Sequence, residues 1–348
     1  MHGEYNSSRC IRGTKESYSL DMNIDKTIIK KILFITLSNI GDVILTLPVL
    51  GVLKREFPKA DITVMPSKST KEIFEADEAV SKIIVYNKRI PLLEKLQFAF
   101  RLRKRGFDLV VDLRHSLFPA IIGSRYHNPF FKSKYKNLHR VDKHLKELES
   151  IGIDINNAPF EIPLNRDDKL DANSILNDIG LLPDDKMIAI APGAKSHIKR
   201  WHETGFSRLC DKLNRELGIK ALLVGDESDR EINQKIKAVG LKETYDLTSK
   251  TTIRQLTHIF SLCSLVVTND SAPLHIASAL NIPTVAIFGP TDEKKYGPLA
   301  KNSVVVRRPL KCSPCEIARC KYNLECMKEI KPDEVFAACK DILSRDIK

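Results

Sequence analysis

Short, almost continuously apolar runs alternate with amphipathic stretches along most of this chain. The predicted strands cover residues 31–37, 61–65, 82–86, 108–113, 186–191, 219–224, 265–268 and 284–288. The predicted helices cover residues 41–57, 92–104, 171–179, 202–217, 228–239 and 253–262. Strands that are apolar throughout are typical of a parallel sheet covered by helices on both faces. The pattern therefore predicts an α/β fold.

The alternation starts twice, and the stretch 158–185 separates its two halves. That stretch contains Pro159, Pro163 and Pro183 and one predicted helix. A chain of 348 residues is long enough for two domains that each bury a core. We therefore expect two doubly wound parallel-sheet domains that face each other across a cleft. The predicted boundaries are a disordered leader over 1–29, domains over 30–165 and 166–330, and a C-terminal helix over 331–348.

The composition is that of a soluble globular enzyme, with 43% hydrophobic and 29% charged residues. No apolar run is long enough to span a bilayer. Residues 1–29 lack the apolar core of a secretory signal. Eight cysteines in such a chain are typical of a reducing compartment. We therefore expect a cytoplasmic protein.

The formal net charge of +12 favours an anionic partner, which includes nucleic acid, an anionic membrane surface and an acidic small substrate. Positive side chains concentrate over 101–146 and include Lys132, Lys134, Lys136 and Arg140. A solvated loop and helix face is an equally good interpretation of this segment. The chain has one tryptophan and no alternation of basic with aromatic residues, which is not typical of a single-strand-binding surface. We expect no nucleic-acid partner.

The stretch most informative about chemistry is VVTNDSAPLHIASALNIPTVAIFGP, residues 266–290. An apolar strand ends at Thr268, a polar turn follows, and a helix of small residues begins at once. Asp270 or Ser271 is expected to cap that helix. The first N–H groups of the helix would face the tip of a parallel sheet, where phosphates bind. His275, one helical turn further on, either fills the helix–sheet interface or lies near the same edge.

Other strand ends carry candidate chemistry as well. Asp42 follows the first strand directly and is either a helix-start stabiliser or a catalytic carboxylate. Glu227 follows the strand 219–224 and is placed like an acid that holds a nucleotide ribose. A loop after the strand 186–191 has the composition of an anion cradle, although a plain surface loop is an equal alternative. The cradle would consist of Gly193, Ala194, Lys195 and Lys199.

A cysteine cluster lies near the C-terminus, with the spacing C-x2-C-x4-C-x5-C. It consists of Cys312, Cys315, Cys320 and Cys326. Four thiols so close in sequence are not typical of core packing, and they indicate either a structural zinc site or paired disulfides. The gap between the second and third cysteine is short for a two-knuckle zinc site, so both alternatives stay open.

Taken in order, these motifs resemble the heptosyltransferases of glycosyltransferase family 9, from about residue 31 to the C-terminal helix. The resemblance rests on IGDVILTLPVL (40–50), APGA (191–194), KRW (199–201), VGDESDRE (224–231), TNDSAPLHIASAL (268–280), FGPTD (288–292) and the CSPC-to-CM segment (312–327). Two positions depart from the family pattern. Ala272 stands where glycine is usual, and Ser38, beside Asn39, is what represents the serine or threonine common before the Gly-Asp pair.

The resemblance implies a glycosyltransferase-B fold and inversion at the sugar. It implies ADP-L-glycero-D-manno-heptose as donor and the lipopolysaccharide inner core as acceptor, and action at the inner face of the cytoplasmic membrane would suit such an acceptor. By the family pattern Asp42 is the candidate base and Lys199 contacts the donor phosphates. The full set of candidate donor-binding residues is Gly193, Ala194, Lys195, Lys199, Glu227, Asp270, Ser271, Ala272 and His275.

From charge alone, we expect Lys132, Lys134, Lys136 and Arg140 to bind the phosphorylated acceptor. No Asp-x-Asp motif lies at a strand end, so we expect catalysis to require no metal or other cofactor. Two other functions are compatible with the sequence. The first is a transferase of the same architecture that uses a UDP or GDP sugar, and the second is a basic nucleic-acid-binding protein with a cysteine cluster.

Overall fold

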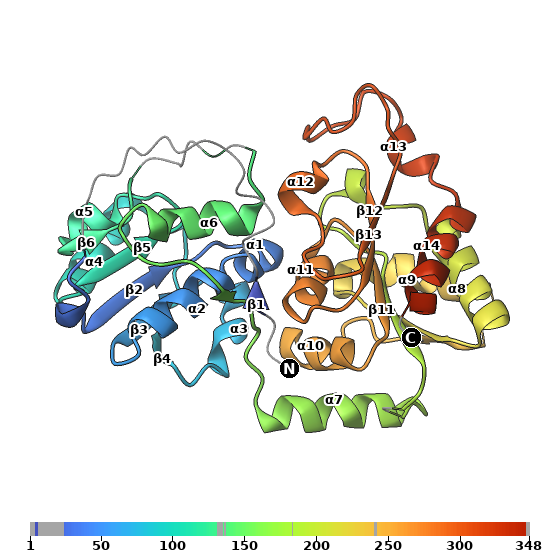
Figure 1. Cartoon of the computed structure of the whole chain (residues 1–348), viewed down its shortest axis with the longest axis horizontal. Helices are drawn as coiled ribbons and strands as arrows, with labels where there is room; N and C mark the ends of the chain where they lie inside the picture. The colour runs from blue at the N-terminus through green and yellow to red at the C-terminus, as the bar shows by residue number, and fades with distance from the viewer. Residues whose placement is uncertain are drawn as a thin grey trace. The chain divides into compact units, whose positions relative to one another are not determined.

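The chain divides into two compact units, residues 1–163 and 164–348, each built on its own parallel sheet (Figure 1). The computed structural model describes residues 4–5, 24–130, 135, 137–182, 184–239 and 242–345. Within these ranges, the two doubly wound α/β sheets confirm the predicted fold class. No helix in the described ranges combines the length and apolar character needed to cross a bilayer.

The described part of the first unit contains a sheet in the order β4-β3-β2-β5-β6, and all of its neighbouring strands are parallel. Its strands are β2 (Lys31–Ile35), β3 (Asp61–Met65), β4 (Val80–Ile83), β5 (Leu109–Asp112) and β6 (Tyr126–His127). Its helices are α1 (Ile40–Ile44), α2 (Leu47–Glu56), α3 (Glu72–Glu75), α4 (Leu92–Arg103), α5 (Phe118–Ile122) and α6 (Arg140–Glu149). A separate antiparallel pair joins β1 (Glu4–Tyr5) to β7 (Ala158–Pro159).

The second unit has the strand order β10-β9-β8-β11-β12-β13 in its described part, again parallel throughout. Its strands are β8 (Met187–Ala191), β9 (Lys220–Leu223), β10 (Thr244–Asp246), β11 (Leu265–Asn269), β12 (Thr284–Phe288) and β13 (Val304–Arg307). Its helices are α7 (Arg166–Asp178), α8 (Glu203–Leu217), α9 (Arg230–Lys237), α10 (Ile253–Ser261), α11 (Ala272–Ala279), α12 (Glu293–Tyr296), α13 (Glu325–Lys328) and α14 (Pro332–Arg345).

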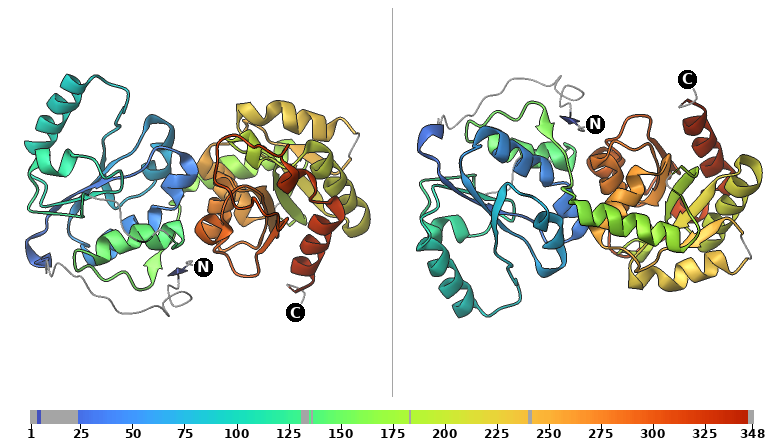
Figure 2. Two further views of the ribbon diagram at one scale, coloured as in Figure 1. Left: turned by 90° about the horizontal axis from the view of Figure 1, so that it is seen from above. Right: turned by 90° about the horizontal axis from the view of Figure 1, so that it is seen from below.

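Helices cover both faces of each sheet, as Figure 2 shows for each unit. In the first unit, Leu33 and Val110 of the sheet pack with Leu102 of α4 and Phe118 of α5. In the second, Ile190 and Val267 belong to a core that also includes Trp201. The central strands β2, β8 and β11 are buried along nearly their whole length. This burial explains why their sequences are continuously apolar rather than alternating.

The described chain differs from the prediction in several places. The predicted helix 41–57 is two helices, α1 and α2, because the chain turns at Thr46, whose hydroxyl donates to the carbonyl of Val43 at 2.7 Å. Pro48, in the first turn of α2, has no N–H to continue the first helix. Helix α7 begins five residues earlier than predicted, at Arg166, because Asn165 and Asp168 form a capping box.

Helix α6 was not predicted, although Val141, Leu145 and Leu148 provide a helical spacing of apolar residues that could have revealed it. Part of the predicted leader 1–29 is also ordered. Lys26–Ile28 form a 3₁₀ helix capped by Asp25, and residues 24 and 29 are buried. Apart from these and β1, the predicted leader lies outside the described residues.

Candidate active site

In each sheet the strand order reverses once, and a candidate residue lies at that point in each unit. In the first unit the strand order reverses between β2 and β5, and in the second it reverses between β8 and β11. Ligands of open parallel sheets bind outside the carboxyl ends of the strands at such a switch point. Asp42 follows β2, and Asp270 follows β11, so each lies at the switch point of its own unit.

Asp42 lies in the first turn of α1 and is half-buried. The side-chain amide of Asn39 donates to Asp42 Oδ2 at 2.8 Å, which fixes the orientation of the carboxylate. A carboxylate at a helix start is stabilised by the positive end of the helix dipole. The geometry therefore leaves one carboxylate oxygen, Oδ1, outside this hydrogen bond.

Neighbouring strands hold the turn that carries Asp42. Arg114, just after β5, donates from Nε to the carbonyl of Thr36 at 2.5 Å and from Nη2 to that of Leu37 at 3.3 Å. Ser67, after β3, donates to the carbonyl of Ser38 at 3.1 Å. Three consecutive carbonyls are thus tied to two other strand ends. No local sequence pattern indicates Arg114, because the carbonyl that it binds lies 78 positions away in the chain.

In the second unit, Lys199 and Asp270 form an ion pair at the switch point. Lys199 Nζ lies 2.7 Å from Asp270 Oδ2, and the Asp270 side chain is 4% exposed. The ammonium also lies over the ring of Tyr296, 5.7 Å from its centroid. An ammonium has three donors, so the hydrogen bond to Asp270 leaves two to bind an anion. Asp270 thus holds the Lys199 ammonium close to the start of α11.

A hydrogen-bond network orients the segment around Lys199. Asn269 accepts from the backbone N–H of Trp201 at 3.1 Å and donates to the carbonyl of Pro192 at 2.7 Å. Arg200 Nε donates to the carbonyl of Ala194 at 2.7 Å. The end of β11 therefore holds the loop after β8 at two points, at Pro192 before Lys199 and at Trp201 after it. Asn269, which the sequence analysis did not single out, is the link.

Helix α11 begins with Ser271 at its N-cap, as one of the two predicted alternatives. The Ser271 hydroxyl lies 3.2 Å from that of Thr268 rather than on the helix backbone. Pro273 occupies the first turn and has no N–H, so the N–H groups that can face an anion there are those of Ser271 and Ala272. His275 is buried in the helix, which agrees with the interpretation that it fills the helix–sheet interface.

The loops after β8 and β9 meet at a residue that sequence analysis missed, Asp229. A Cβ added to Gly193 would lie 2.2 Å from the Asp229 carboxylate, and one added to Gly225 would lie 2.8 Å from it. Burial and the nearby Asp226 raise the pKa of Asp229. A glycine at position 193 is therefore needed to leave room for the Asp229 side chain. Ala194 is buried, whereas Lys195 is exposed.

Glu227 is exposed at the carboxyl end of β9, where the sequence predicted a ribose-binding acid. Its carboxylate accepts from Arg230 Nε and Nη2, both at 2.6 Å, and from the Ser249 hydroxyl at 3.0 Å. The hydrogen bonds from Arg230 and then Ser249 lower the pKa of Glu227 to about 2. Arg230 and Ser249 thus hold the Glu227 carboxylate at the carboxyl end of β9.

The sequence profile of glycosyltransferase family 9 (heptosyltransferase) matches residues 96–325. The lipooligosaccharide heptosyltransferase 2 of Campylobacter jejuni is 31% identical over 319 residues, which cover 87% of this chain and 95% of that protein. This chain belongs to glycosyltransferase family 9. The predicted resemblance is confirmed, and the protein is a glycosyltransferase enzyme of the heptosyltransferase family.

Solved structures show the same fold as this glycosyltransferase. A family 9 glycosyltransferase from Veillonella parvula superposes with a TM-score of 0.81 at 24% identity, covering 93% of this chain and 99% of that one. The ADP-heptose lipopolysaccharide heptosyltransferase II of Escherichia coli gives a TM-score of 0.75 at 22% identity, covering 91% and 100%. Both support the two-sheet glycosyltransferase-B architecture.

The predicted acceptor-binding residues of this glycosyltransferase are placed only in part. Lys132, Lys134 and Lys136 lie outside the described residues. Arg140 is the first residue of α6, whose N-cap is His139. Its neighbour on the same helix is His144, and burial, followed by the charges of Arg140 and Lys143, lowers the pKa of His144 to about 3. The first turns of α6 thus carry Arg140, Lys143 and the acidic Asp142 beside an uncharged His144.

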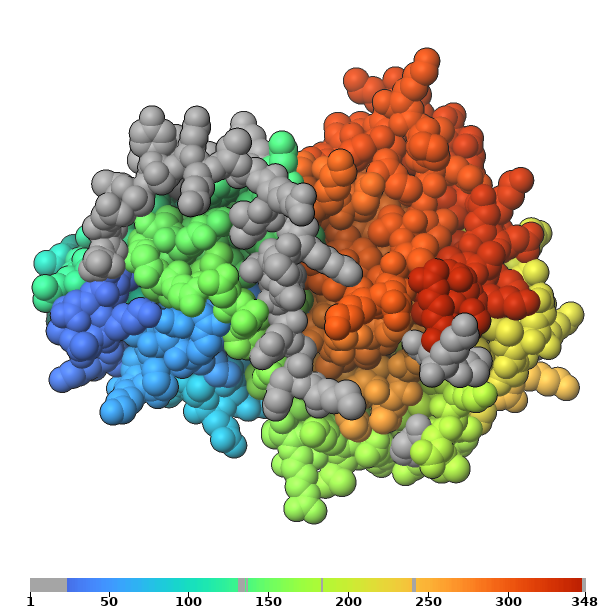
Figure 3. Space-filling view, viewed as in Figure 1, coloured from blue at the N-terminus to red at the C-terminus, as the bar shows by residue number. Residues whose placement is uncertain are grey.

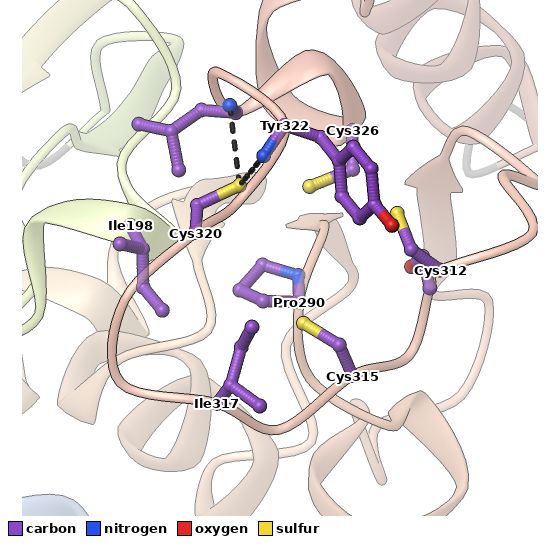
Figure 4. A pocket seen from close by; sticks show the side chains of 10 residues that line it. Ile198, Pro290, Cys312, Cys315, Ile317, Cys320, Tyr322 and Cys326 are labelled. Atoms are coloured by element: carbon purple, nitrogen blue, oxygen red, sulfur yellow. Dashed lines mark hydrogen bonds between the residues drawn. The ribbon is translucent and has the colours of Figure 1, made fainter.

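The four clustered cysteines of this family 9 enzyme line one pocket with Pro290 and Ile198, the neighbour of Lys199 (Figure 4). All four are free thiols rather than disulfides. Cys320 Sγ accepts from the N–H groups of Tyr322 and Leu324 at 3.3 and 3.4 Å. Burial, and then the three other thiols, raise the pKa of Cys326 to about 11. In the described ranges, no group of three or more His, Cys, Asp or Glu side chains is arranged to hold a metal ion.

Proposed function

We propose that this glycosyltransferase transfers a heptose, with inversion, from ADP-L-glycero-D-manno-heptose to the inner core of lipopolysaccharide. Family membership supports the reaction class. Its relatives include a lipooligosaccharide heptosyltransferase and an ADP-heptose lipopolysaccharide heptosyltransferase, and these activities support the proposed donor and acceptor. The single structural observation that carries the proposal is the Lys199–Asp270 pair at the start of α11.

This pair suits a leaving diphosphate. When the bond between the sugar and the diphosphate breaks, negative charge grows on the departing oxygen, and a positioned ammonium stabilises that charge more in the transition state than in the bound donor. In our proposal Lys199 provides the ammonium, and the N–H groups of Ser271 and Ala272 provide further donors. Asp270 contributes by holding Lys199 in place, because a buried carboxylate in direct contact with a diphosphate would repel it.

Asp42 is the proposed general base. Its carboxylate takes the proton of the acceptor hydroxyl, the hydroxyl oxygen forms a bond to the anomeric carbon, and the bond from that carbon to the diphosphate oxygen breaks. ADP leaves with the electron pair of that bond. Attack from the face opposite ADP inverts the anomeric centre. Asp42 belongs to the first unit and Lys199 to the second, so transfer by this route requires both.

The other residues proposed to bind the donor come after strands β8, β9 and β11 of the second unit. We propose that Glu227 accepts from the ribose hydroxyls and that the loop formed by Gly193, Ala194 and Lys195 lies along the phosphates. His275, one turn into α11, would support this wall of the donor site from beneath. The exposed carboxylate of Glu227 and the exposed Lys195 support these assignments.

For the acceptor, we propose that Lys132, Lys134, Lys136 and Arg140 bind phosphorylated sugars of the core. The acceptor is built on a lipid, so the enzyme would act in the cytoplasm at the inner face of the cytoplasmic membrane. The net charge of +12 supports an anionic acceptor surface. We do not expect nucleic acid to be a partner.

The test is a donor panel. Purified protein is incubated with a deep-truncated lipopolysaccharide and with ADP-heptose, a UDP sugar or a GDP sugar in separate reactions, and product mass is measured. We expect a mass gain of one heptose with the ADP-linked donor alone. Transfer from a UDP or GDP sugar would favour the alternative transferase. Tight, salt-dependent binding of single-strand or duplex nucleic acid without any transfer would favour the nucleic-acid-binding alternative.

We expect a metal to have a structural role in this protein and no role in the transfer step. Catalysis should require none, because Lys199 and the start of α11 supply the positive charge that a divalent ion would otherwise supply. Cys312, Cys315, Cys320 and Cys326 form a candidate structural Zn²⁺ site, which would require their side chains to turn toward one another. We expect initial rates unchanged after brief EDTA treatment, and one zinc per chain by elemental analysis that Cys320→Ser removes. Rates abolished by EDTA and restored by Mg²⁺ would contradict the metal-free transfer step.

A further inference from the structure

Helix α4 exposes an apolar face. Leu92 is 72% exposed, Leu93 is 68% and Phe100 is 55%, and Leu96 is exposed beside them. The helix packs onto the sheet through Ala99 and Leu102. Single exposed apolar residues are ordinary on a protein surface, but several together on one helix mark an interaction surface.

The exposed apolar residues form one continuous stripe. At 3.6 residues per turn, Leu92, Leu93, Leu96 and Phe100 fall within about 100° of the helix circumference. The stripe lies beside the buried stripe rather than opposite it. Leu117, also exposed, stands at the N-cap of α5, which packs against α4 (Figure 1). We call Leu92, Leu93, Leu96, Phe100 and Leu117 the α4 surface.

Positive charge borders this surface. The exposed residues Arg101, Arg103, Lys104 and Arg105 lie within five positions at and just after the C-terminal end of α4. The guanidinium of Arg103 donates to the carbonyl of Ile121 at 3.3 Å, which ties the basic end of α4 to α5. Glu94 is the single acidic residue of the helix. The α4 surface is thus apolar and is bordered by positive charge at the C-terminal end of α4.

We propose that the α4 surface docks this enzyme onto an anionic phospholipid leaflet. A helix that carries leucine and phenylalanine on one face and Lys or Arg beside them lies in the membrane interface, with its apolar face among the acyl chains and its cations at the headgroups. The proposal rests on the proposed function in one respect, namely that the acceptor is anchored in a membrane.

A lipid surface fits these residues better than a protein partner does. Four exposed cations adjoin the apolar stripe in sequence against one acidic residue of the helix, and such a border of one sign complements an anionic leaflet. A comparison within the chain supports the same view. Leu170 of α7 is 55% exposed but lies between Asp167 and Asp171, whose charges an anionic leaflet would repel. Leu170 therefore serves as a matched control.

The test is co-sedimentation with vesicles of phosphatidylethanolamine and phosphatidylglycerol, and with vesicles of phosphatidylcholine alone. We expect the full chain to bind the anionic vesicles, and Leu93→Gln with Phe100→Gln to weaken that binding about tenfold or more. Lys104→Gln with Arg105→Gln should weaken it at low salt and less at high salt, since salt screens exposed charges. Leu170→Gln should bind as the unaltered protein does.

Transfer to a soluble, deacylated acceptor separates this proposal from the proposed function. The α4 variants should keep that activity while they lose activity on acceptor embedded in vesicles. If the Leu93 and Phe100 variant binds anionic vesicles as well as the unaltered protein, the α4 surface is not the docking site. Concentration-dependent dimerisation that the same variant abolishes, without vesicle binding, would overturn the proposal in favour of a protein partner. Vesicle binding without any heptosyl transfer would contradict the proposed function alone.

Discussion

Asp42 depends on its neighbours for its position, because Asn39 holds its carboxylate and Arg114 and Ser67 hold the turn before it. We predict that Asp42→Asn, which keeps the size of the side chain and removes its basicity, lowers kcat by ~100- to 10,000-fold. ADP affinity should not change. Steady-state kinetics and ADP titration measure both quantities.

Asp61→Asn is the matched control for this prediction. Asp61 is an exposed aspartate at the opposite, amino-terminal end of a strand in the same sheet, and its replacement should leave kcat unchanged. Thermal unfolding of both variants checks that the fold is intact. A loss of less than about tenfold in a well-folded Asp42→Asn protein would remove Asp42 from the role of base.

Lys199 and Asp270 should act as one unit. If Asp270 works by holding the ammonium, Lys199→Ala and Asp270→Ala each remove the same stabilisation of the leaving group, and each should lower kcat by about 100-fold. The double variant should then be little worse than either single variant, since contacting residues are not additive. A double-mutant cycle on kcat, with ADP affinity measured alongside, tests this. If the two single losses in kcat multiply in the double variant, or if Asp270→Ala binds ADP more tightly, then Asp270 does not position Lys199.

At the scale of elements, the loops after β8 and β9 share Asp229. A Cβ at position 193 would force the Asp229 carboxylate away from the N–H of Asp226 and break the capping box that begins the 3₁₀ helix Glu227–Asp229. We therefore predict that Gly193→Ala lowers the free energy of unfolding by about 1–3 kcal/mol. Urea denaturation measures this loss.

The rescue experiment distinguishes this cause from a role of Gly193 in phosphate binding. Asp229→Ala removes the clashing carboxylate, so Gly193→Ala combined with Asp229→Ala should be more stable than Gly193→Ala alone. A Gly193→Ala protein of normal stability that binds ADP poorly would mean instead that the glycine serves the phosphates directly.

The sequence pattern predicted elements more reliably than it predicted contacts. The strands β3 and β12 have the predicted bounds, because the sequence of a buried parallel strand is an apolar run that a polar turn follows. The turns that carry Asp42 and Asp270 were predicted for the same reason. Arg114 and Asp229 were not, since their importance comes from strands brought together by the fold and not from neighbours in sequence.

At the scale of the whole molecule, the pattern of strands and helices starts twice and so predicted two sheets, but it did not predict which charged side chains pair with each other. Asp270 was expected at the phosphates, and the structure pairs it with Lys199. Glu227 was expected to be available to a ribose, and it also accepts from Arg230. Many acidic and basic residues of the chain could form such ion pairs, so only the folded backbone tells which of them do.

The pH dependence of overall stability follows from His144. Burial and neighbouring cations hold its pKa at about 3 in the folded protein, against an ordinary value of 6.5 when unfolded. Between these values the unfolded chain binds the extra proton, so stability is complete above about pH 6.5 and falls as the pH is lowered toward 3. We predict a loss of about 1 kcal/mol between pH 7 and pH 5, half the full linkage value, because solvent still screens the half-buried ring.

His144→Gln isolates this contribution. The glutamine does not titrate, so urea denaturation at pH 7 and at pH 5 should show a difference in unfolding free energy that is smaller than in the unaltered protein by about 1 kcal/mol. His202→Gln is the control, because burial also lowers the pKa of His202, but by less. Its effect on the pH dependence should therefore be the smaller of the two. An unaltered pH dependence in His144→Gln would mean that the ring at position 144 accepts a proton in the folded protein as readily as in the unfolded chain.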